Sequence, residues 1–127
     1  MRLNNLITFL PVKLTVLIWV LHSFQFLYGS PLDVVPMSEV THTVINSGPW
    51  SAASSWDNGV PDSGARVYIP SGKEIIVDQV HTTRLKWIRL EGKLSFAKDR
   101  NTQLLVETII GTPSSSLEIG NETNPIA

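Results

Sequence analysis

Asp57 and Asp62 are the residues whose type and spacing come closest to catalytic chemistry, because two carboxylates on either side of a sugar bond form the acid/base pair of glycoside hydrolysis. The same oxygens are candidate calcium ligands, although their spacing lacks the regular acidic repeat of a dedicated calcium loop. Residues 57–59 and 61–64 are also strong turn sequences. We therefore favour a turn-making role for both aspartates and assign no catalytic residue.

Histidines and serines add no second catalytic pattern. His42 and His81 are far apart and lack the spacing of metal ligands. Ser51, Ser54 and Ser55 have no partnered histidine signature that would activate a hydroxyl. The sequence therefore predicts no metal site and no cofactor, with calcium as a weak alternative.

Aromatic side chains are the remaining candidates for ligand contact, since indole and phenol rings stack on sugar rings. The candidates are Trp50, Trp56, Trp87 and Tyr68. We favour packing in the core or as a cap for each tryptophan, because indoles bury large areas. If the polar loop around them binds a ligand, the predicted contacts are Trp56, Asp57 and Asn58.

The N-terminal residues have the order of a secretory signal. Arg2 and Lys13 flank an apolar stretch at 14–20, and the small residue Gly29 follows. We predict a signal peptide at residues 1–29 and hence a secreted protein. An uncleaved N-terminal membrane anchor is the alternative, and only then would the chain contact a membrane.

Composition limits the partners and the sources of stability. The whole chain has 127 residues, 10 basic and 11 acidic, which fits one domain. Without residues 1–29, which hold two of the basic residues and no acid, the net charge is −3. This balance makes nucleic acid an unlikely partner. There is no cysteine, so burial and backbone pairing must stabilise an exported domain.

Short β-prone runs repeat after residue 64, and Gly or Pro interrupts each one. An offset of about 19 relates many of them, as expected for stacked coils of a solenoid. We predict an all-β fold, a right-handed parallel β-helix, with an antiparallel β-sandwich as the alternative. The predicted stacked pairs are Leu85 with Leu104, Trp87 with Val106, Leu90 with Ile109, Gly92 with Gly111, Ile75 with Leu94, Val77 with Phe96, Leu94 with Leu117 and Phe96 with Ile119.

The same periodicity predicts which side chains form the core. Stacked coils bury one row of apolar residues in each rung. The predicted buried residues are Leu94, Phe96, Leu105, Leu117 and Ile119.

A set of residues from 47 to 126 resembles the eight-glycine domain, an extracellular module named for its recurring glycines. The resemblance covers about 80 residues and rests on Trp50, Trp56-Asp57, Gly59-Val60-Pro61, Gly64, Val67, Ile69-Pro70, Gly72, Val77-Asp78, Leu94-Ser95-Phe96, Asp99-Arg100-Asn101-Thr102, Leu105-Val106, Leu117-Glu118-Ile119-Gly120 and Asn124-Pro125-Ile126. It implies association with extracellular glycans, hyaluronan in particular. No catalytic residue is carried over from it.

These observations predict three segments and one function. Residues 30–46 form an N-terminal approach segment, and residues 47–127 form the eight-glycine-like β domain, expected to be incomplete at its C-terminus. We expect a secreted, non-catalytic glycan-associated module at the front of a larger extracellular protein, with extracellular polysaccharide as its partner. The alternatives are the front end of a polysaccharide-degrading enzyme and a structural or adhesin-like cap. Asn121 begins the one N-glycosylation sequon.

Overall fold

The computed structural model describes residues 29–120. Contacts divide the chain into Met1–Ser30 and Pro31–Ala127, and the described residues belong almost entirely to the second unit. The predicted signal peptide or anchor and the sequon residue Asn121 lie outside the described residues, apart from Gly29. Among the residues that are described, no helix is long and apolar enough to cross a membrane.

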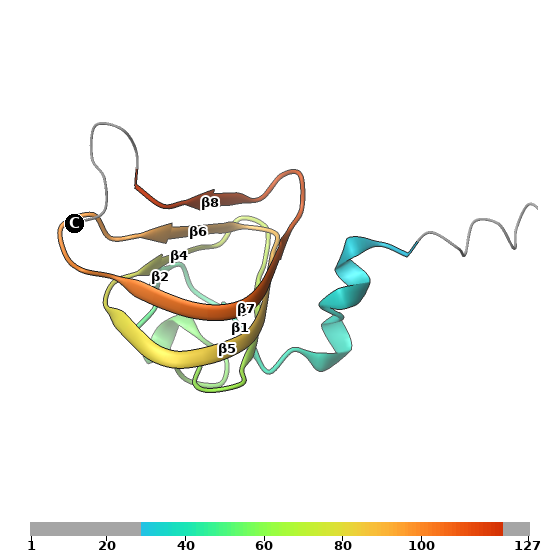
Figure 1. Cartoon of the computed structure of the whole chain (residues 1–127), viewed down its shortest axis with the longest axis horizontal. Helices are drawn as coiled ribbons and strands as arrows, with labels where there is room; N and C mark the ends of the chain where they lie inside the picture. The colour runs from blue at the N-terminus through green and yellow to red at the C-terminus, as the bar shows by residue number, and fades with distance from the viewer. Residues whose placement is uncertain (1–28, 121–127) are drawn as a thin grey trace, which may run out of the picture. The chain divides into compact units, whose positions relative to one another are not determined.

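The described part consists mainly of short strands joined by turns (Figure 1). Three short 3-10 helices precede most of the strands: η1 (Pro31–Val34), η2 (Met37–Glu39) and η3 (Ala53–Ser55). The strands are β1 (His42–Thr43), β2 (Gly48–Pro49), β3 (Arg66–Ile69), β4 (Glu74–Val77), β5 (Val80–Leu90), β6 (Lys93–Phe96), β7 (Gln103–Gly111) and β8 (Ser116–Glu118).

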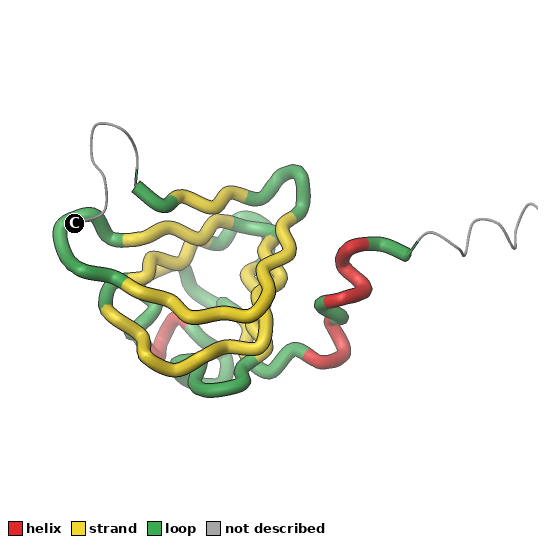
Figure 2. The backbone as a smooth tube through the Cα atoms, in the orientation of Figure 1, coloured by secondary structure: helices red, strands yellow, loops and turns green. Residues whose placement is uncertain are grey.

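Strands alternate between two parallel sheets as the chain winds. Strands β1, β3, β5 and β7 form a four-stranded odd sheet, and β2, β4, β6 and β8 form a four-stranded even sheet. Every strand pair in both sheets is parallel. Each coil therefore adds one strand to each sheet, which is the architecture of a β-solenoid (Figure 2). The predicted parallel β-helix is confirmed, and the sandwich alternative is wrong.

The first coil begins within residues 30–46, the predicted approach segment. His42 and Thr43 of β1 pair with Val67 and Tyr68 of β3, so they already belong to the odd sheet. The signal in the sequence is weak because β1 has only two residues.

The predicted offset of 19 is correct between β4 and β6 and wrong in the odd sheet. In the even sheet, Ile75 lies beside Leu94 as predicted. In the odd sheet, Leu85 lies beside Val106 instead of Leu104, which is an offset of 21. A register shift between Val80 and Arg84 of β5 accompanies this longer coil. Because side chains alternate with a period of two, an error of two residues still leaves each side chain on its predicted face.

The core lies between the two sheets and is filled from alternate strand positions. Strand β3 has the burial pattern intermediate, buried, intermediate, buried, which matches the strand period of two. The buried apolar cluster comprises Val44, Trp50, Trp56, Ala65, Val67, Ile69, Ile75, Val77, Leu85, Ile88, Leu90 and Leu94. Its members come from the odd sheet, the even sheet and the loop between β2 and β3, together with Val44, which directly follows β1.

The predicted core set is only partly correct. Leu94 is fully buried, and Phe96 is partly buried against the core cluster. Leu105 is partly buried but is not among the side chains that pack against this cluster. Leu117 and Ile119 are 45% and 59% exposed, so their predicted burial is wrong. They lie on or just after β8, which has a neighbour on one side in the even sheet of the described chain. A side chain inside a solenoid is fully buried only when a coil packs on each side of it, which explains the exposure of Leu117 and Ile119.

Gly92 is required by the close stacking of two turns. A Cβ atom at this position would lie 2.3 Å from the Pro70 carbonyl oxygen and 2.3 Å from the Lys73 carbonyl oxygen. Both obstacles are backbone atoms held in the preceding coil, where the Lys73 carbonyl accepts a hydrogen bond from the Lys93 N–H at 2.8 Å. At Gly111 the nearest obstacle is the rotatable hydroxyl of Ser115, at 2.6 Å.

We predict that Gly92→Ala is more destabilising than Gly111→Ala. The Gly92 change forces two turns apart, at a cost of about 1–3 kcal/mol, the range for overpacking a close-packed site. Gly111→Ala has a smaller effect because the Ser115 side chain can rotate away. Urea unfolding of the two variants measures the difference, and equal loss of stability would contradict the stacking argument.

We also predict a large difference between two leucines that stack in the same column. Leu94→Ala removes a fully buried side chain, at an expected cost of about 2–5 kcal/mol. Leu117 lies beside Leu94 in the even sheet but is 45% exposed, so Leu117→Ala should cost much less. Thermal or urea unfolding compares them, and a larger loss for Leu117→Ala would show that the burial pattern is incorrect.

Candidate functional site

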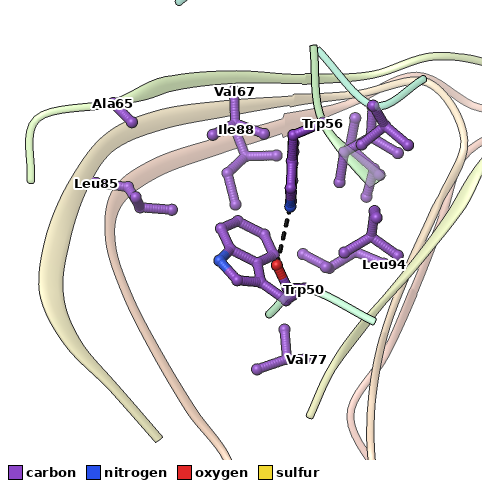
Figure 3. Packing of buried hydrophobic residues seen from close by; sticks show 12 residues of the cluster. Trp50, Trp56, Ala65, Val67, Val77, Leu85, Ile88 and Leu94 are labelled. Carbon is purple, nitrogen blue, oxygen red and sulfur yellow. Dashed lines mark hydrogen bonds between the residues drawn. The ribbon is translucent and has the colours of Figure 1, made fainter. Parts of the chain in front are cut away.

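Trp50 and Trp56 fill the interior of the solenoid where the loop after β2 turns inward. They are 0% and 3% exposed, and their rings meet edge to face with centroids 4.8 Å apart. The Trp56 Nε1–H donates a buried hydrogen bond to the Trp50 carbonyl oxygen at 2.9 Å (Figure 3). The preferred core interpretation of these tryptophans is confirmed, and Trp56 offers no free ring face to a ligand in this structure.

Asp57 and Asn58 follow Trp56 directly and lie at the surface. Asp57 Oδ1 accepts a hydrogen bond from the Thr43 N–H at 2.8 Å, and the Asp57 N–H donates to the Thr43 carbonyl at 3.0 Å. Asn58 Nδ2 donates to the Thr41 carbonyl at 3.3 Å. These bonds hold the turn against β1 and its approach. Within residues 29–120, no bond occupies Asp57 Oδ2 or Asn58 Oδ1.

The other predicted carboxylate, Asp62, has a local structural role. Its Oδ1 accepts the Ser63 N–H at 2.7 Å, and its carbonyl accepts the Ala65 N–H at 3.0 Å. Both interactions close the turn that leads into β3. Asp57 and Asp62 thus each accept a backbone N–H that holds their own turn, which is the turn-making role that we favour for both.

A polar cluster that the sequence did not predict joins Ser51 and Asp78. Asp78 follows β4 and receives the Ser51 hydroxyl at Oδ2, at 2.5 Å, and the Ser51 N–H at Oδ1, at 3.0 Å. Partial burial by itself would raise the pKa of Asp78, but the two bonds from Ser51, helped by a backbone hydrogen bond within Asp78 and by the charge of His81, lower the pKa overall. The cluster ties the loop after β2 to the end of β4. The two residues are 27 positions apart, which explains why spacing did not reveal them.

His81 lies at the edge of this cluster, next to the core. Its ring centroid is 5.7 Å from that of Trp50, and its Nε2 atom is buried with no hydrogen-bond partner among the described residues. Burial lowers the pKa of His81, and the negative charge of Asp78 partly opposes this effect. The other candidate, His42, lies in β1 with its Nδ1 2.8 Å from the Thr41 hydroxyl. Within residues 29–120, no group of three His, Cys, Asp or Glu side chains is placed to hold a metal ion.

A polar groove crosses the corner where the odd strands turn into the even strands. It has a cavity volume of about 300 Å³ and is open to solvent. Its lining comes from three successive turns and the first residues of the even strands: Ser71, Gly72, Lys73, Glu74, Glu91, Gly92, Lys93, Ser114 and Ser116. The glycines that interrupt the β-prone runs were the signal in the sequence for these turns, but only the stacking of the coils brings the turns together.

Comparison with known proteins gives one family and one relative. The family model described as the G8 domain matches residues 55–127. Fibrocystin-L from Mus musculus is 35% identical over 77 residues, which is 60% of this chain and 2% of the relative. The chain thus matches only a small part of this relative's length. No solved structure gives a significant match.

We predict that His81 makes stability depend on pH. Because burial lowers the pKa of His81 in the folded state, the unfolded state binds the proton more readily. Neutral His81 contributes fully to the free energy of unfolding when the pH is above its ordinary pKa of 6.5. This contribution is lost as pH falls through 6.5 towards the lower pKa of the folded state. The free energy of unfolding should therefore fall more steeply below pH 6.5 in the wild type than in His81→Gln.

Urea unfolding over a pH series measures this difference. Titration of Asp78 does not overlap with this effect, because the stability that Asp78 contributes is lost only as pH falls below its ordinary pKa of 3.8. Parallel curves for the wild type and His81→Gln between these two limits would contradict the prediction.

Proposed function

Because this chain belongs to the G8 domain family, a family of extracellular-type modules, we propose that it is a secreted, non-catalytic module that associates with polysaccharide outside the cell. We propose further that it forms the N-terminal part of a larger extracellular protein. Hyaluronan is one candidate among such polysaccharides.

The observation that carries the proposal is the exposed turn at Asp57 and Asn58. Its backbone and one polar atom of each side chain are held by Thr41 and Thr43. The remaining oxygen of each side chain is available for sugar hydroxyl groups. A turn that is already ordered loses little conformational freedom on binding, which favours association. Trp56 supports the turn from beneath, so hydrogen bonds rather than ring stacking provide the contact.

Electrostatics suggest the character of this binding. The net charge of −3 without residues 1–29 opposes long-range attraction to a polyanion. Binding to polysaccharide is therefore weak and depends little on salt. The same charge disfavours nucleic acid as a partner.

A structural cap is the second candidate, and the unequal ends of the solenoid favour it. Trp50 and Trp56 close the interior near the first coil, whereas Leu117 and Ile119 near the last described strand are 45% and 59% exposed. Within residues 29–120 only the end near the first coil is covered, and such an arrangement is suited to begin a longer stack of coils. The front end of a polysaccharide-degrading enzyme, the remaining alternative, has no specific observation in its favour.

We predict that Asn58→Ala weakens polysaccharide binding without unfolding the protein. Loss of one hydrogen bond corresponds to about 0.5–1.5 kcal/mol, or roughly a two- to tenfold rise in Kd. Calorimetric titration of the full chain with soluble polysaccharides, including hyaluronan, measures the effect. Ser63→Ala, in the neighbouring exposed turn, is the matched control and should bind as the wild type does.

Trp56→Ala is not a suitable test of contact, because emptying a buried indole site costs about 3–5 kcal/mol and endangers the fold. If the folded wild-type chain binds no polysaccharide, the association proposal fails and the structural cap takes its place.

A further inference from the structure

The corner groove has a floor of backbone and walls of polar side chains. Gly72 and Gly92 contribute no side chain, and Gly92 lies directly on the turn formed by Pro70 and Lys73. The next turn stacks in the same way, since the Ser116 N–H donates to the Gly92 carbonyl at 3.0 Å. The glycines therefore leave a hollow across stacked coils, and their close packing keeps its floor rigid.

Polar groups repeat along the groove with the spacing of the coils. Glu74 lies beside Lys93, and Lys93 lies beside Ser116, in three successive strands of the even sheet. Neighbouring strands in a sheet are about 4.8 Å apart. This repeat is close to the length that one pyranose ring adds to an extended sugar chain. A short oligosaccharide lying across the coils would meet new hydrogen-bonding groups at each ring.

The charges of the groove balance. Its lining has two lysines and two glutamates. Lys93 is held by Glu74 at 3.2 Å and by Glu118 at 3.3 Å, and Glu91 is held by Arg89 at 2.8 Å. Within the described range of the chain, Lys73 forms no ion pair. The groove thus presents hydrogen-bond donors and acceptors without a net field that would select a polyanion.

We propose that the corner groove is a binding site for a neutral oligosaccharide, with Lys73 and Ser116 as hydrogen-bonding contacts. The choice of sugar as the ligand class rests on the proposed function. The position of the site and the preference for an uncharged sugar rest on the lining of the groove and its balanced charges. This site is separate from the turn at Asp57 and Asn58, neither of which lines the groove.

The test is titration of the full-length chain with a neutral cello-oligosaccharide and with a hyaluronan oligosaccharide of the same length. Lys73→Met keeps the length of the side chain but removes its charge and donors. Kd for the neutral sugar should rise by about fivefold, as expected for one lost hydrogen bond. Ser116→Val should act in the same direction. Lys86→Met is the matched control, because Lys86 pairs with Glu107 and does not line the groove.

Each result decides one part of the proposal. Weaker binding in the two groove variants, with normal binding in Lys86→Met and low sensitivity to salt, supports it. If both groove variants bind like the wild type while Asn58→Ala binds weakly, the groove is not the site, and glycan association stands. Preference for hyaluronan that salt abolishes overturns the neutral class. A folded wild-type chain that binds neither sugar overturns this site, and the proposed function fails with it only when the soluble polysaccharides also do not bind.

Discussion

Close stacking of the coils is the constraint on which the rest of the structure depends. Parallel strands of successive coils hydrogen-bond side by side, and this sets the distance between coils at about 4.8 Å. At the corners the turns of successive coils must lie equally close together, although turns have no regular hydrogen-bond ladder that sets their spacing. Gly92 is where this requirement is strictest, because two backbone oxygens occupy the space of its missing side chain. The surface hollow at this corner is a direct consequence of the same packing.

Interior packing provides the stability that disulfides would otherwise supply. The chain has no cysteine, so a small domain must gain stability from burial. Trp50 and Trp56 bring two large rings into the core from an otherwise polar loop. The hydrogen bond from Trp56 to the Trp50 carbonyl satisfies one buried polar group, and the bonds from Ser51 to Asp78 anchor the end of the loop. The loop is thus ordered by the core, and its exposed turn is ordered with it.

The two surfaces proposed to meet sugars owe their rigidity to different contacts. The turn at Asp57 and Asn58 is held by bonds to the first coil, whereas the corner groove is held by stacked turns of later coils. Both surfaces present polar atoms on an ordered backbone, and neither uses the tryptophan rings that are buried in the core. The protein therefore separates its apolar side chains, which stabilise coils, from the polar turns that face solvent.

The sequence alone determined the fold class, because short β runs with glycine or proline between them predict stacked coils, and Ile75 pairs with Leu94 as the repeat requires. It also located the turns around Asp57 and Asp62, whose residue types favour local backbone bonds. Tertiary structure decided the rest. The stacked structure placed Leu85 beside Val106 instead of Leu104, since turn lengths set register and vary between coils. Contacts over distant positions, which no local pattern encodes, joined Ser51 to Asp78 and assembled the corner groove.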